Sequence, residues 1–248
     1  PNVSLEEELI NNNRKDEIDN NPKEEPPKDL NNWPKVESCK KGSYSLTSTK
    51  VGAVRWDAWV GSHNDVGRAV EKTLSPSQFH FRVPFYGEEI SSDSIKVECV
   101  TQDCMDQEIA YAKYAGLDYW AFIWYPEDSG LQQSLNLYLK SKFKDDIKFT
   151  LIMQTDNWSY IPAEKLKTYF SLENYQTVLG DRPLFYIFPG GETITKTKLD
   201  EVRSAANAAG RGEPYFVYLN QSGGYHLVRE LGIDAVSMYA LTSFNDGQ

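Results

Sequence analysis

From Lys50 onward, nearly continuous apolar runs alternate along the chain with segments whose apolar residues recur at helical spacing. The apolar runs predict strands and the helical spacing predicts helices. We expect strands at 50–56, 119–125, 147–154, 182–188, 214–220 and 234–240, and helices at 100–116, 131–142, 161–179, 197–209 and 224–232. Strands that are apolar on both faces are typical of a parallel sheet covered by helices.

Two connections share the same order of residues: "AKYAGLDYWAF" and "VRELGIDAVSM" each run helix, Gly, apolar residue, Asp, strand. This repetition predicts an α/β fold, a (β/α)8 TIM-type barrel with about six of its eight units present. An open sheet is the alternative. The chain stops at "SFNDGQ" without a closing helix, so we expect the barrel to lack its C-terminal units.

Residues 1–49 differ from the rest and are expected to be a polar leader or tether, with the barrel domain at 50–248. They contain "EEE", "NNN" and "KEEPPKD" and few apolar anchors. So few apolar side chains do not offset the entropy of ordering the segment. The alternative is a strap that packs along the barrel through Leu5, Leu9, Ile10 and Trp33.

Charge and composition narrow the classes of partner. The 26 basic and 36 acidic residues give a net charge of −10, which argues against binding to nucleic acid. No apolar run of membrane-spanning length is present. The three cysteines and three histidines show no metal-ligand spacing, and "PGG" at 189–191 lacks the spacing of a nucleotide loop. We therefore expect no metal site and no nucleotide-binding loop, and ordinary thiols rather than a Cys99–Cys104 disulfide.

Acidic, amide and aromatic residues follow the predicted strands, at the ends where parallel α/β folds bind ligands. Amides and carboxylates hydrogen-bond sugar hydroxyls, and aromatic rings cover the apolar faces of sugars. Polar loops also follow strands in every such fold, so a single residue carries little weight. The candidate catalytic carboxylates are Asp57, Glu127 and Asp156, and the candidate substrate-binding residues are Trp56, Trp59, Arg82, Tyr86, Trp124, Tyr125, Asp128, Gln154, Trp158, Asn220 and Tyr239.

Several stretches together resemble a known family: "VGAVRWDAW", "FHFRVPFYGE", "QEIAYAKYAGLDYWAFIWYP", "VLGDRPLFYIF" and "GIDAVSMYA". They are similar to barrel proteins of the glycoside hydrolase family 99-like group, which includes proteins described as O-antigen biosynthesis proteins. The resemblance covers residues 50–248 and implies a (β/α)8 barrel that acts on a glycan without a cofactor. The family's carboxylate motif lies late in the barrel. The sequence shows nothing that matches it beyond a superficial likeness at 243–248, so no catalytic pair is carried over.

These observations predict a glycosidase that cleaves a complex polysaccharide by carboxylate acid/base catalysis. A non-catalytic glycan-binding protein with an aromatic groove is the alternative. A glycosyltransferase-like protein of polysaccharide biosynthesis ranks third, because no nucleotide-sugar phosphate site is visible. A barrel acting on extracellular polymer would be exported, so we expect a periplasmic or surface-associated bacterial protein.

Overall fold

The structure is a computed structural model, and it describes residues 49–220 and 225–239. The predicted leader, its four apolar anchors, Cys39 and the "SFNDGQ" segment lie outside these residues. Within them, no helix combines the length and hydropathy needed to cross a membrane.

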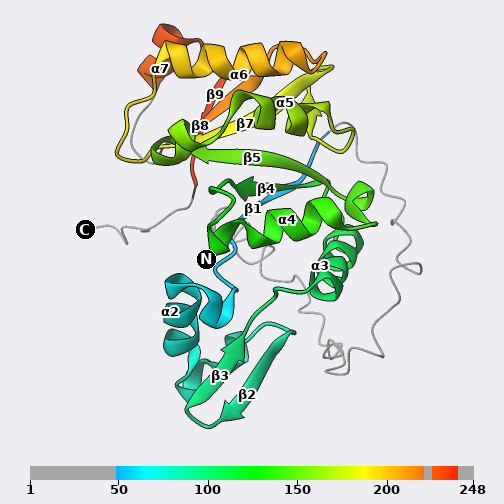
Figure 1. Ribbon diagram of the computed structural model, residues 1–248, viewed down its shortest axis with the longest axis vertical. Helices are drawn as coiled ribbons and strands as arrows, with labels where there is room; N and C mark the ends of the chain where they lie inside the picture. Colours follow the sequence, from blue (N-terminus) through cyan, green and yellow to red (C-terminus); the bar gives the residue numbers. More distant parts are fainter. Residues whose placement is uncertain (1–48, 221–224, 240–248) are drawn as a thin grey trace, which may run out of the picture. The chain divides into compact units, whose positions relative to one another are not determined.

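Six parallel strands form the main sheet in the order β1-β4-β5-β7-β8-β9. Their bounds are Gly52–Arg55 (β1), Tyr119–Ile123 (β4), Lys148–Gln154 (β5), Arg182–Phe188 (β7), Tyr215–Leu219 (β8) and Ala235–Ser237 (β9) (Figure 1). The spatial order equals the chain order, without the reversal that defines a doubly wound sheet. The predicted α/β fold, with parallel strands arranged as in part of a (β/α) barrel, is confirmed.

Helices separate successive strands of the sheet, and four of them contribute to the main core. They are Gln102–Tyr114 (α3), Gln133–Lys140 (α4), Ala163–Ser171 (α5) and Lys196–Ala208 (α6), and Tyr225–Leu231 (α7) follows β8. Met105, Leu135, Phe170 and Val202, one from each of the four, belong to a single buried cluster. All four helices thus cover one face of the sheet, as same-handed crossovers between sequential parallel strands require.

The two faces of the sheet follow the strict alternation of each strand. Trp120 and Phe122 belong to the cluster with the helices, which marks the outer face. Ala121 and Ile123 belong to a second cluster made only of residues in strands and at strand ends, which marks the inner face. The remaining inner-face members come from β5, β7, β8 and β9 and the residues beside them: Ile152, Leu184, Tyr186, Phe188, Val217, Leu219, Ala235 and Tyr239 among others.

Between β1 and α3 the chain forms an insertion for which the sequence pattern predicts no helix or strand. It contains Gly61–His63 (η3), Asp65–Leu74 (α2), Ser77–Arg82 (η4), and the antiparallel pair Gly87–Ser91 (β2) and Ser94–Val97 (β3) (Figure 1). Leu74, Ile95 and Val97 form a small core of its own. The insertion leaves the sheet at the carboxyl end of β1, so the chain returns to α3 beside that end.

The helix predicted at 161–179 is shorter than expected. It ends at Ser171, and Leu172 is already extended. The Phe149–Tyr175 bridge and the short strand Thr177–Val178 (β6), antiparallel to β7, occupy the rest of the range. Tertiary pairing has overridden local helical periodicity there. Short 3-10 turns at Gly130–Gln132 (η5), Lys144–Asp146 (η6) and Thr155–Tyr160 (η7) complete the described elements.

Candidate functional site

Aromatic side chains gather on the inner face at the carboxyl ends of β1, β4 and β7, together with the segment after β9. We call Trp56, Tyr125, Phe188 and Tyr239 the aromatic surface. Trp56 is 46% exposed, and the other three are partly buried. The rings of Phe188 and Tyr239 lie 4.7 Å apart between centroids. Large rings are left half-covered at the end of the sheet where parallel folds bind ligands.

Polar contacts hold the two rings nearest β1 in place. The polar indole of Trp56 lies near enough to the phenol of Tyr125 to affect its ionisation. Burial raises the pKa of Tyr125, and the Trp56 indole opposes the shift. The backbone N–H of Tyr125 donates to Oε1 of Gln132 at 2.9 Å, and Gln132 is fully buried. Because a buried amide side chain has few alternative partners, it fixes the backbone from which the Tyr125 ring projects.

A second group of polar residues lies on the outer side of β1, with Arg55 at its centre. Nε of Arg55 donates to Oδ1 and Oδ2 of Asp57 at 2.8 and 2.9 Å. Its Nη2 donates to Oε2 of Glu108, on α3, at 2.5 Å. The guanidinium carbon also lies 4.3 Å from the centroid of the Trp120 ring. One buried cation therefore joins two carboxylates and an aromatic ring.

Burial dominates the electrostatics of this charged group. It raises the pKa of Asp57 and that of Glu108, and Arg55 opposes both shifts. Arg55 itself stays charged, because the two carboxylates raise its pKa against the effect of its own burial. Burial, followed by the charge of Glu108, also raises the pKa of the Tyr86 phenol. Tyr86, a predicted ligand residue, thus lies near this group.

A cavity of about 420 Å³ opens beside the charged group. Arg55, Asp57 and Glu108 supply its polar wall, and Trp59 and Phe85 are among its aromatic lining. The charged groups of this wall are bound to one another, because the carboxylates of Asp57 and Glu108 both accept hydrogen bonds from Arg55. Asp57 is consequently held in an ion pair and is not poised for proton transfer.

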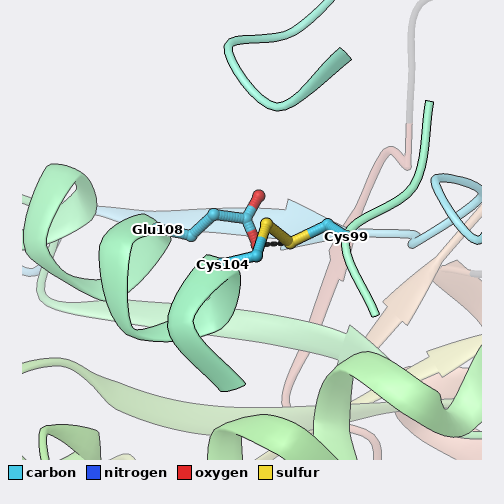
Figure 2. A group of neighbouring side chains, drawn as sticks. All are labelled: Cys99, Cys104 and Glu108. Atoms are coloured by element: carbon cyan, nitrogen blue, oxygen red, sulfur yellow. Dashed lines mark hydrogen bonds between the residues drawn. A yellow bond between two sulfur atoms is a disulfide. The ribbon is translucent and has the colours of Figure 1, made fainter. Parts of the chain in front are cut away.

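A disulfide joins Cys99 to Cys104 next to Glu108, contrary to the expectation of ordinary thiols. Figure 2 shows Cys104 and Glu108 projecting from the same side of α3, with the Glu108 carboxylate beside the disulfide. Sγ of Cys99 lies 3.5 Å from Oε2 of Glu108. These three residues have the side chains of a metal site. Their sulfurs are bonded to each other and Glu108 is bound to Arg55, so the group is not set up to hold a cation.

Two tryptophans that the sequence predicted to bind substrate lie outside the candidate site. Trp124 is 1% exposed and Trp158 2% exposed, and both belong to the core between the sheet and the helices. The Trp158 ring packs against Phe185 at 5.8 Å. The alternation of β4 explains the correction for Trp124, because Tyr125 faces inward and its predecessor therefore faces the helices.

The remaining predicted carboxylates are dispersed. Glu127 is exposed and forms an ion pair of 2.6 Å with Lys165 on α5. Asp128 is exposed. Asp156 accepts the backbone N–H of Glu192 at 2.9 Å and Nε2 of Gln154 at 3.3 Å, and it forms no ion pair with another described residue. The structure therefore does not join Asp57, Glu127 and Asp156 through any contact.

Two further residues predicted to bind substrate, Arg82 and Asn220, make their described contacts away from the aromatic surface. Arg82 is exposed, and its guanidinium carbon lies 5.6 Å from the Phe79 ring and 5.3 Å from the Phe81 ring. Asn220 donates its backbone N–H to Ser237 at 3.0 Å and so extends the pairing of β8 with β9. Neither contact places the side chain on the aromatic surface.

Sequence reasoning missed Phe188, Gln132, Arg55 and Glu108. Alternation along β7 was a usable signal for Phe188, which shares a face with Leu184 and Tyr186. A charged residue inside an apolar strand was a signal for Arg55. No local signal pointed to Glu108, which is separated from Arg55 by 53 positions.

No protein-family model matches the chain, and no curated protein matches it. Among solved structures, it is similar to the GH99 endo-α-mannosidase from Bacteroides thetaiotaomicron, with 13% identity, a TM-score of 0.43, and coverage of 64% of this chain and 56% of that chain. A structure of the GH99 endo-α-mannosidase from this organism in complex with BIS-TRIS-propane gives 16% identity, a TM-score of 0.44, and coverage of 60% and 49%. The chain spans about half the length of these two structures.

Proposed function

We propose that this protein binds a glycan at the aromatic surface. The observation that carries the proposal is the half-exposed Trp56 ring, which lies near Tyr125 at the carboxyl ends of neighbouring parallel strands. A ring with one free face offers a flat apolar platform, and sugar rings present apolar C–H faces that fit one. The net charge of −10 disfavours polyanions and leaves neutral polysaccharides as the favoured class.

A panel of immobilised plant, algal, fungal and bacterial polysaccharides tests this function. We expect one neutral class to bind, and calorimetry with its soluble oligosaccharides to give a dissociation constant that W56A raises about tenfold, or ~1.4 kcal/mol. The matched control is Y114A, which removes a ring that is 76% exposed at the end of α3, away from the aromatic surface. An equal loss in both variants, or no binding across the panel, would contradict the proposal.

Hydrolysis of a glycosidic bond is a second candidate function, and the position of Asp156 favours it. This partly exposed carboxylate follows β5 and forms no ion pair with a described residue, whereas Glu127 and Glu192 are each bound to a lysine. A glycosidase uses two carboxyl groups, one as acid and one as nucleophile or base. Release of reducing ends from the bound polysaccharide, abolished in D156N with binding retained, would support hydrolysis. Binding without any release would favour the glycan-binding protein.

We also propose that the protein is exported to an oxidising compartment. The Cys99–Cys104 disulfide supports this, because such bonds persist outside the reducing cytosol. Trapping free thiols with a heavy alkylating agent in intact source cells tests it. We expect Cys99 and Cys104 to be protected until a reductant is added, and alkylation of both without reduction would contradict export.

A further inference from the structure

We propose that the Cys99–Cys104 disulfide and Glu108 act as positioning elements for Trp56, with Arg55 as the link between them. The consequence for ligand affinity rests on the proposed glycan-binding function. The position of the Trp56 ring itself does not, and it can be measured without a ligand.

The disulfide restrains Glu108 through helix α3, which carries both Cys104 and Glu108. Cys104 and Glu108 are four residues apart on α3 and therefore lie on the same side of the helix, one turn apart. Cys99 is 3% exposed, and its backbone N–H donates to the Trp59 carbonyl at 2.8 Å. The disulfide thus ties the first turn of α3 to a segment that is bonded to the loop after β1, through Trp59 and the Val60–Glu98 bridge. This limits the movement of the turn that carries Glu108.

Glu108 in turn restrains Arg55. The 2.5 Å contact from Nη2 of Arg55 to Oε2 of Glu108 leaves little freedom for either side chain. A bifurcated hydrogen bond from Nε to both carboxylate oxygens of Asp57 restrains the other side of the guanidinium. Arg55 is therefore clamped between α3 and the residue that follows Trp56.

Arg55 restrains Trp56 through the backbone, because the two residues are adjacent in the chain. Pairing between β1 and β4 ends at Arg55 with Phe122, so Trp56 lies just beyond the ladder. Its flanking residues, Arg55 and Asp57, are joined by their side chains on the outer side, which directs the Trp56 ring to the inner face. Beyond the strand pairing, this side-chain bond and the hydrogen bond from the Ala58 N–H to the Trp56 carbonyl at 3.1 Å set the path of the backbone at Trp56.

Glu108 thus has a role that differs from general stabilisation. Loss of its charge frees Arg55 on one side and lets residues 55–57 shift, which moves Trp56 relative to Tyr125. The Trp158 ring packs against Phe185 on β7, two strands beyond β4, and its indole N–H forms no hydrogen bond with any described residue. A variant that acts through Arg55 should therefore disturb one tryptophan and spare the other.

Fluorine NMR of protein labelled with 5-fluorotryptophan tests the inference directly. The chain has 6 tryptophans, and W56F and W158F identify two of their resonances. We expect E108Q and the double variant C99S/C104S each to shift or broaden the Trp56 resonance and to leave that of Trp158 unchanged. The matched control is D234N, which removes a carboxylate held by Arg182 at 2.6 Å on the β7–β8 side of the sheet and should leave Trp56 unchanged.

A binding measurement separates this inference from the proposed function. If the polysaccharide panel yields a ligand, we expect E108Q and C99S/C104S to raise its dissociation constant about threefold to tenfold, and D234N to leave it unchanged. If nothing binds, the proposed function fails, and the fluorine spectra still decide the positioning inference. An unmoved Trp56 resonance in a folded E108Q or C99S/C104S protein overturns it. So does a shift of similar size at Trp56 in D234N.

Discussion

The indole of Trp56 lies near the phenol of Tyr125, beyond the ends of two adjacent parallel strands, and opposes the rise in the Tyr125 pKa that burial causes. Trp56 directly follows β1, and Tyr125 comes two positions after the end of β4 and packs against the inner-face cluster. The contact turns two strand ends into one aromatic surface and leaves 46% of Trp56 open to a ligand.

Removal of the Tyr125 hydroxyl should loosen this contact. In Y125F the indole N–H of Trp56 loses the phenol oxygen near it, and a polar contact of this kind contributes at most about 0.5–1.5 kcal/mol. We expect the free energy of unfolding in urea to fall by no more than that amount and the fluorine resonance of Trp56 to move. Y114F, which changes an exposed phenol on α3, is the control and should leave both measurements unchanged.

The fold could be predicted from the sequence because its signals are local. Apolar runs of strand length, helical spacing between them and the repeated Gly-apolar-Asp order all lie within short windows. The insertion at 60–98 gave weaker signals, because its strands are short and its apolar residues pack against each other in a small core of their own.

The site could be predicted only in part, and β4 shows why. Its residues are apolar on both faces, so the pattern did not reveal that Trp124 faces the helices and Tyr125 the interior. A shift of one residue changes the face. Arg55 and Glu108 are 53 positions apart, and their pairing depends on how α3 packs beside β1. The spacing of residues in the sequence therefore cannot predict it.

Two tryptophans assigned to different environments should differ in their effect on stability. Trp158 is 2% exposed, and truncating a large buried aromatic residue costs about 3–5 kcal/mol. Trp56 is half-exposed, so W56A should cost about 1 kcal/mol or less. Chemical denaturation of W158A and W56A measures both. Similar losses would mean that the assignment of Trp158 to the core, or of Trp56 to the surface, is wrong.

The close approach of Gly190 to Asp156 gives a further prediction. A β-carbon at Gly190 would overlap the Asp156 carboxylate, whereas one at Gly191 would lie 3.3 Å from its Oδ1. The Gly190 N–H also donates to Oγ1 of Thr155 at 2.8 Å. We expect G190A to lower the free energy of unfolding by about 1–3 kcal/mol through overpacking.

G191A is the matched control for this prediction and should cost clearly less. Equal melting temperatures for G190A and the unchanged protein would show that the loop after β7 does not pack on Asp156. If the protein is a hydrolase, G190A should also lower its rate, because the displaced carboxylate is the candidate catalytic group.

The pH dependence of stability should distinguish E108Q from the unchanged protein. Burial raises the pKa of Glu108 in the folded state above its ordinary value, and Arg55 offsets this only in part. A group with a raised folded pKa contributes stability that is complete below its unfolded pKa, about 4.3 for glutamate. That contribution is lost as the pH rises through the folded pKa. Glutamine does not ionise, so E108Q escapes this loss.

We therefore expect the unfolding free energy of E108Q, relative to the unchanged protein, to rise with pH from about 4.3 upward. Arg55 keeps Asp57 as its partner in the variant, so the buried guanidinium is not left unpaired. Urea denaturation at a series of pH values measures the difference. A relative stability that falls as the pH rises would mean that the attraction between Arg55 and Glu108 outweighs the burial of the carboxylate. A variant that is no less stable at neutral pH and still moves Trp56 would show that Glu108 positions the ring at a cost to the stability of the fold.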